Sequence, residues 1–211
     1  MSTSETVLET PTAPRQSPGL RPYRITIDVY ERIAASGAFG DKSSVFLWKG
    51  QLVEKVSDMT KGRPHVIALD ELDRLMGDLV RGQGYFVEQD QPIALGRESE
   101  PEPDLKCVRG AIRDYGERTP TAHNCPLVVE VSDSSLLDDT GEMLRAYASA
   151  VIPVYWVVNI PNHRIDVYST PSGPTAVPSY AELRSYAPGE QVPVVLDGRE
   201  VGLVTVSDVL P

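Results

Sequence analysis

The chain has 211 residues, of which 41% are hydrophobic and 24% are charged. These proportions are close to globular averages, so wholesale disorder is excluded, and the length is typical of one domain with some spare residues. Twenty basic against thirty acidic residues give a net charge of −10. That charge disfavours a nucleic-acid partner unless a basic patch or a metal ion offsets it.

The chain carries no sign of a membrane or secreted protein. No apolar run reaches the about 18 residues that a membrane helix needs, and no secretory signal is visible at the start. The two cysteines, Cys107 and Cys125, fit a reducing compartment. We therefore expect a cytoplasmic protein without a membrane partner.

In chain order, a proline-rich arm precedes the folded part. Residues 1–22 hold four prolines among serine and threonine, with few large apolar side chains, and we expect them to be disordered. A single domain then spans residues 23–211. Its first elements are a helix over residues 26–37 and two short strands within 45–55 that turn at Lys49-Gly50.

The remaining pattern mixes strands and helices. Apolar residues recur every three or four positions from His65 to Arg81 and predict a long helix after Pro64. Further elements are strands at 85–89, 91–95, 104–108, 127–132, 154–158 and 164–168, a helix from 134 or 135 to 150, and a hairpin turning at Asp197-Gly198. Because strict alternation is absent, the predicted fold class is α/β bordering on α+β, with one central mixed sheet.

Two acids stand in positions that need an explanation. Glu130 lies in the most apolar strand, where a carboxylate must be paired, protonated or bound to a metal. Asp104 follows Pro101-Glu102-Pro103, a stiff approach to the next strand. Two carboxylates on neighbouring strands suit a hard divalent cation that acidifies a bound water. The alternative is a surface aspartate in a turn and a glutamate satisfied by an amide or an arginine.

Three longer segments carry a resemblance to a known family. They are EPEPDLKCV (100–108), LVVEVSDSSLLDD (127–139) and LRAYASAVIPVYWVVN (144–159), followed by RIDVYSTPSG. Together they closely resemble the Uma-type restriction endonucleases, bacterial proteins of the PD-(D/E)xK nuclease superfamily, over residues 23–210. The resemblance implies a restriction-endonuclease-like core, a central mixed sheet flanked by helices with extra hairpins, whose metal site lies at strand ends.

The resemblance also implies roles for named residues. Asp104 matches the aspartate of the PD motif, and Glu130 matches the acid of the (D/E)xK motif. In the superfamily these acids and the main-chain carbonyl after the second hold Mg²⁺, for which Mn²⁺ can substitute, and the substrate is DNA. Glu54, in QLVEK, is the candidate for an additional upstream acid.

The lysine of the family motif is missing. Its position in (D/E)xK is Ser132, and the alternative family position, four residues after an aspartate matching Asp139, is Met143. Lys106 is the predicted substitute because it lies two residues from Asp104, on the same face of the strand. The alternatives for this cation are Lys55 and Lys61.

Three hypotheses about function follow. The first is a Mg²⁺-dependent DNA endonuclease, for which a homodimer stays open because many nucleases of this fold cut as dimers. The second is a catalytically decayed homologue that binds a protein or a nucleic acid, which Met143 and the net charge favour. The third is an unrelated metal-dependent hydrolase of small phosphate esters.

Overall fold

The structure is a computed structural model that describes residues 19–40, 45–54 and 62–211. Most of the predicted arm, residues 1–18, lies outside the described residues, as do Lys55 and Lys61. The helices are α1 (Ile27–Ala35), α2 (Arg63–Val80), α3 (Leu136–Asp138), α4 (Leu144–Ser149) and α5 (Val206–Val209). The strands are β1 (Val45–Trp48), β2 (Gln51–Glu54), β3 (Tyr85–Gln89), β4 (Leu105–Arg109), β5 (Leu127–Ser132), β6 (Val154–Asn159), β7 (Arg164–Pro171), β8 (Tyr180–Tyr186), β9 (Gln191–Leu196) and β10 (Arg199–Thr205).

A six-stranded mixed sheet forms the centre of the fold, in the order β3-β4-β5-β6-β7-β8. β5 and β6 run parallel, and every other pair of neighbours in this sheet is antiparallel. All residues of β5 and β6 are buried, which explains why both sequences are almost continuously apolar. The sheet and its helices confirm the predicted α/β fold class with a central mixed sheet.

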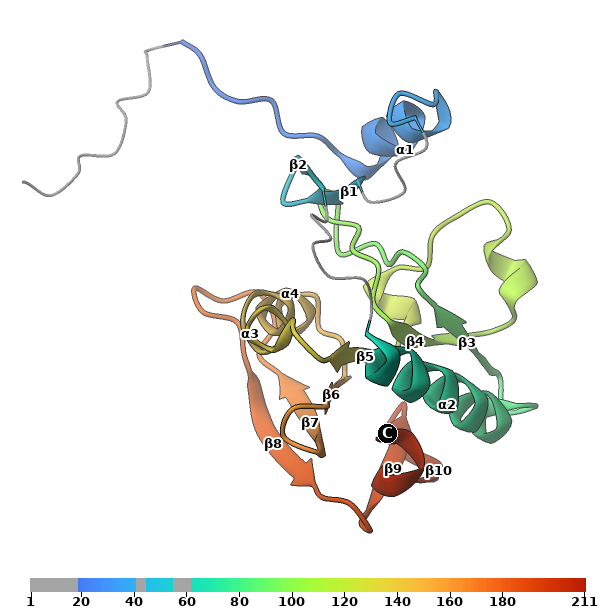
Figure 1. The fold of residues 1–211 in the computed structure, drawn as a ribbon. Helices are drawn as coiled ribbons and strands as arrows, with labels where there is room; N and C mark the ends of the chain where they lie inside the picture. The colour runs from blue at the N-terminus through green and yellow to red at the C-terminus, as the bar shows by residue number, and fades with distance from the viewer. Residues whose placement is uncertain (1–18, 41–44, 55–61) are drawn as a thin grey trace, which may run out of the picture.

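The two faces of the sheet carry separate cores. α2 covers one face together with α5 and the β9–β10 hairpin (Figure 1), and its buried apolar stripe comprises Ala68, Leu69, Leu72, Met76 and Val80. On the other face, Tyr147 of α4 packs with Tyr155 and Val128. Since successive side chains of a strand point to opposite faces, Glu130 shares the face of Val128.

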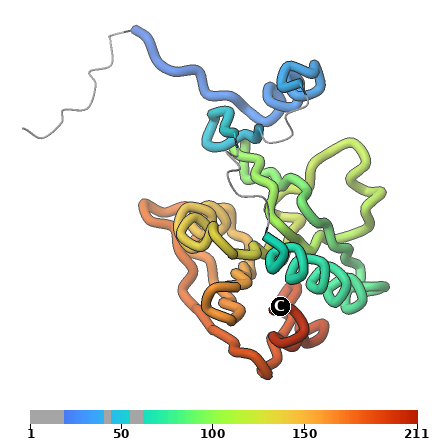
Figure 2. The backbone as a smooth tube through the Cα atoms, in the orientation of Figure 1, coloured from blue at the N-terminus to red at the C-terminus, as the bar shows by residue number. Residues whose placement is uncertain are grey.

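The N-terminal elements stand at one end of the molecule (Figure 2). The β1–β2 hairpin is joined to the segment before β4, where the Gly50 amide donates to the Glu98 carbonyl at 2.7 Å and Leu47 bridges to Glu100. Trp48 Nε1 and Lys49 Nζ of the same hairpin donate to Glu142 Oε1 at 2.9 and 2.6 Å. The hairpin therefore contacts residues that precede β4 in the sequence and a residue that follows β5.

Most predicted elements are confirmed, but one predicted strand is wrong. Residues 91–95 form an irregular segment in which only Ala94 makes an isolated bridge, to Thr121. Pro92 has no main-chain N–H to donate to a ladder, which explains why a strand-like composition gives no strand here. Conversely, β8 was not predicted, because this edge strand is largely exposed and carries charged residues in place of an apolar pattern.

The predicted helix over 134–150 is also interrupted. α3 and α4 are separated by a π-helical turn over Asp139–Met143 that contains Gly141. Such turns often mark functional positions, and this one begins at Asp139 and ends at Met143. None of the helices in the described ranges combines the length and apolarity that crossing a membrane requires.

Candidate active site

The candidate site lies where β4 and β5 stop pairing through their main chains. Leu105 and Val129 are the last paired residues at this end of the two strands. Beyond them, the Asp104 N–H donates to Glu130 Oε2 at 3.2 Å, and the Val131 N–H donates to Asp104 Oδ2 at 2.8 Å. Two carboxylates thus accept main-chain donors at the strand ends, and the structure brings Asp104 and Glu130 together.

Each carboxylate is also held by a helix. Tyr147 of α4 donates its hydroxyl to Glu130 Oε1 at 2.8 Å in a buried contact. His65, in the first turn of α2, places Nε2 3.1 Å from Asp104 Oδ2. The resulting chain His65–Asp104–Glu130–Tyr147 links the two helical layers across the end of the sheet, and we call it the carboxylate chain.

Asp139 is a third acid beside the carboxylate chain. Its Oδ2 accepts the hydroxyl of Ser132 at 2.6 Å and that of Ser135. Burial raises the pKa of Asp139, the two serine hydroxyls oppose that change, and the negative charge of Asp104 adds to it. Ser132, which the resemblance places at the motif lysine, thus donates a hydrogen bond to an acid.

Among the described residues, negative charges crowd the site. Burial is the largest cause that raises the pKa of Glu130 well above its ordinary value, followed by the charges of Asp104 and Asp139. Hydrogen bonds from Tyr147 and from the Asp104 N–H act in the opposite direction. A divalent cation between the carboxylates would offset both the burial cost and the repulsion between like charges.

The donor set fits Mg²⁺ or Mn²⁺ in part. Mg²⁺ is usually bound through one or two carboxylates, with water and substrate phosphate as the other ligands, which Asp104 and Glu130 can satisfy. In the described part of the chain, no group of three or more His, Cys, Asp or Glu side chains is placed to hold an ion. Glu54 is exposed at the end of β2, so the structure does not add it to the two acids as predicted.

Lys106 is not brought to the acids either. Its ammonium is fully buried, lies 2.8 Å from Glu88 Oε2, and donates to the Gln91 carbonyl at 2.8 Å. Burial lowers the pKa of Lys106, while the Glu88 carboxylate opposes that change. Lys106 was predicted at the metal because it shares a strand face with Asp104. Its ammonium instead forms an ion pair with Glu88, near the end of β3.

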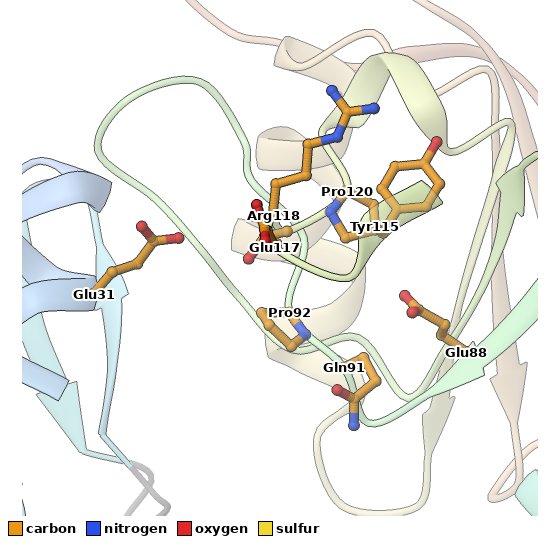
Figure 3. Close-up of a pocket in the computed structure, with 9 residues that line it drawn as sticks. Glu31, Glu88, Gln91, Pro92, Tyr115, Glu117, Arg118 and Pro120 are labelled. Carbon is orange, nitrogen blue, oxygen red and sulfur yellow. The ribbon is translucent and has the colours of Figure 1, made fainter. Parts of the chain in front are cut away.

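A pocket of about 320 Å³ lies beyond this ion pair (Figure 3). Glu31 of α1 borders it on one side, and its other lining residues are Glu88, Gln91, Pro92 and members of the segment 115–120. Neither Asp104 nor Glu130 lines it. The candidate active site is therefore the carboxylate chain, whose hydrogen-bond geometry is defined, and not this pocket.

Comparison with known proteins decides the family. The family model of Uma2, described as "Putative restriction endonuclease", matches residues 27–205. The chain belongs to this family. Uma2 membership confirms the resemblance found in the sequence and supports a nuclease. No curated protein matches the chain.

A solved structure supports the fold of this Uma2 chain. It is described as a putative nuclease belonging to DUF820 from Anabaena variabilis, and it matches with a TM-score of 0.59. The match covers 88% of this chain and 97% of that chain at 14% sequence identity. At that identity the similarity shows a shared fold and carries nothing further.

His65 is the residue that sequence reasoning missed. The sequence predicted no role at the site for His65, because its contact with Asp104 spans 39 positions of sequence. A signal was present: position 65 continues the stripe of Leu69, Leu72 and Met76 on α2. A polar residue at the end of a buried stripe needs a buried partner.

Proposed function

We propose that this chain is a Mg²⁺-dependent DNA endonuclease in which Asp104 and Glu130 hold the metal. The observation that carries the proposal is the contact between the Asp104 N–H and the Glu130 carboxylate at the strand ends, in a chain of the Uma2 family. A bound divalent cation supplies a water of lowered pKa and neutralises charge that develops on the phosphodiester. Mn²⁺ is expected to replace Mg²⁺.

The residues of the carboxylate chain have distinct parts in this proposal. Asp104 and Glu130 offer oxygens from two neighbouring strands, so their spacing is set by the sheet rather than by a loop. Tyr147 fixes one oxygen of Glu130 through its hydroxyl. Asp139 adds negative charge next to both ligands and so increases the local preference for a cation.

DNA is the proposed substrate, although the net charge of −10 opposes it. Weak binding is therefore expected. A homodimer would allow cleavage of both strands, and a cytoplasmic location would suit the two free, buried cysteines, Cys107 and Cys125. Both belong to the proposal.

A second function is favoured by one specific observation. Met143 stands at the alternative lysine position, and Lys106 is committed to Glu88. Non-cationic residues at both lysine positions of the family pattern, Ser132 and Met143, fit a catalytically decayed homologue that binds a protein or a nucleic acid. Loss of a general acid or base typically costs about 10²–10⁴-fold in rate, which slows an enzyme without abolishing it.

Cleavage of supercoiled plasmid tests the proposal. Wild-type protein should nick the plasmid with Mg²⁺ or Mn²⁺ but not with EDTA, and Glu130→Ala should remove the activity. Bis-p-nitrophenyl phosphate serves as a second substrate, because its turnover without any nicking would favour the hydrolase of small esters. Inactivity on both substrates with either metal would favour the decayed homologue.

A further inference from the structure

His65 occupies a rigid place beside the candidate site. It lies in the first turn of an 18-residue helix whose buried stripe packs against the sheet. The residue is 7% exposed, and the fixed helix leaves its ring little freedom to turn away from Asp104. The 3.1 Å contact between His65 Nε2 and Asp104 Oδ2 is thus set by the packing of α2.

The hydrogen bonding of the ring is one-sided. An ionised carboxylate only accepts hydrogen bonds, so His65 Nε2 must carry the hydrogen in the contact with Asp104. The other ring nitrogen, Nδ1, is buried and has no hydrogen-bond partner within the described part of the chain. Buried polar atoms are usually satisfied. The unpaired Nδ1 therefore indicates that the ring is oriented by its contact through Nε2. Among the described residues, the Asp104 carboxylate is the polar group that the His65 ring contacts.

Two donors from different elements meet at the same oxygen of Asp104. The Val131 N–H reaches Oδ2 from β5 at 2.8 Å, and His65 reaches it from α2. The carboxylate plane is therefore fixed from two directions. Donors of this kind orient the ligands of a metal, and their removal typically lowers metal affinity or activity by about 10- to 100-fold.

We propose that His65 is a positioning residue of the metal site, whose Nε2–H holds the Asp104 carboxylate in the orientation that binds the divalent ion. This inference rests on the proposed function. His65 acts through Asp104 and contacts neither metal nor substrate. The first turn of α2 thus contributes to the site, although none of the family motifs quoted from the sequence lies in it.

Three substitutions separate positioning from packing. His65→Gln places an amide N–H near the position of Nε2, whereas His65→Asn places one near the position of Nδ1, and His65→Ala removes both. The exposed His123→Ala is the matched control. The readouts are Mn²⁺ affinity by calorimetry and the melting temperature of the metal-free protein.

We expect metal binding to be retained only where the substituted side chain keeps a donor near the position of Nε2. His65→Ala and His65→Asn should weaken Mn²⁺ binding by about 10- to 100-fold, while His65→Gln retains most of the affinity and His123→Ala all of it. The proposal is overturned if His65→Ala binds Mn²⁺ like the wild type, or if the Gln and Asn variants lose affinity equally. A wild-type protein that binds no Mn²⁺ would instead refute the proposed function itself.

A spectroscopic measurement covers the case in which His65→Ala fails to fold. The ¹⁵N shifts of the imidazole rings in the metal-free wild type should show one histidine with hydrogen on Nε2 and a bare Nδ1. Asp104→Asn should change that signal and leave those of His123 and His163 unaltered. An unchanged third signal would contradict the contact on which the proposal depends.

Discussion

Asp104, the residue before β4, lies opposite Glu130 of β5, and the bond between them runs from a main chain to a side chain. The Asp104 N–H donates to Glu130 Oε2 at 3.2 Å, one step beyond the last ladder pair of Leu105 and Val129. The end of the ladder leaves main-chain donors that need acceptors, and the two carboxylates supply them. The same geometry that satisfies the backbone therefore concentrates negative charge at one point.

Replacing Glu130 with glutamine should change how stability depends on pH. The pKa of Glu130 is raised in the folded protein, so the folded state binds this proton more tightly than the unfolded state. The stabilisation that this proton gives the folded state is fully present below the pKa of the unfolded state, whose ordinary value is 4.5. It is lost as pH rises through the pKa of the folded state. The difference in melting temperature, Glu130→Gln minus wild type, should hence increase from about pH 5 to about pH 8 in metal-free buffer.

The control for this experiment is Glu200→Gln, an exposed acid on β10. Its difference from the wild type should be flat over the same range of pH. A flat difference for Glu130→Gln would mean that the pKa of Glu130 is not raised by the fold.

Removing the hydroxyl of Tyr147 should lower metal affinity more than it lowers the stability of the fold. Tyr147→Phe deletes the donor to Glu130 Oε1, which stabilises the ionised carboxylate, so the pKa of Glu130 should rise further. We expect a loss of about 1 kcal/mol in stability together with weaker Mn²⁺ binding at neutral pH. Tyr180→Phe is the matched control, because its hydroxyl donates to the Ile152 carbonyl in the same core. Equal Mn²⁺ affinities in the two variants would contradict a role for Tyr147 at the site.

Lys106 should behave as a structural residue. Lys106→Met leaves Glu88 buried without its ion-pair partner, and breaking such a pair typically costs about 3–5 kcal/mol. Adding Glu88→Gln should recover much of the melting temperature. Nicking activity per folded molecule should be nearly unchanged in the double variant. A folded but inactive double variant would return Lys106 to the catalytic role that the sequence suggested.

Restoring the family lysine should increase activity. Met143 is half-buried at the end of the π-helical turn that begins at Asp139, and it packs against the core that holds Tyr147. Met143→Lys should raise Mg²⁺-dependent nicking by an amount on the order of 10²-fold at most, the lower range for a positioned proton acceptor. Met143→Leu controls for packing. A folded lysine variant with no gain would show that the position is misassigned.

The sequence predicted the sheet and the two acids better than the surroundings of the acids. β5 was predicted with its observed limits because a strand buried on both faces is almost continuously apolar. The two acids were found because Glu130 breaks that pattern and Asp104 follows two prolines. Both signals are local in the sequence.

The parts that were not predicted depend on contacts between distant residues. Lys106 was predicted at the metal from its strand face alone. One face of a strand offers several possible partners, and the observed partner is Glu88. The contact between His65 and Asp104 depends on how α2 docks on the sheet. The π-helical turn at Asp139 shifts side-chain directions that regular helical spacing would fix.

The most direct test of the account is a calorimetric titration of Mn²⁺ into metal-free protein at neutral pH, for the wild type, Asp104→Ala, Glu130→Ala and Glu200→Ala. We expect binding to the wild type and to the Glu200 variant, and a loss of at least about tenfold in affinity for each of the other two. Equal binding by all four proteins, or no binding by the folded wild type, would contradict the claim that Asp104 and Glu130 form a metal site.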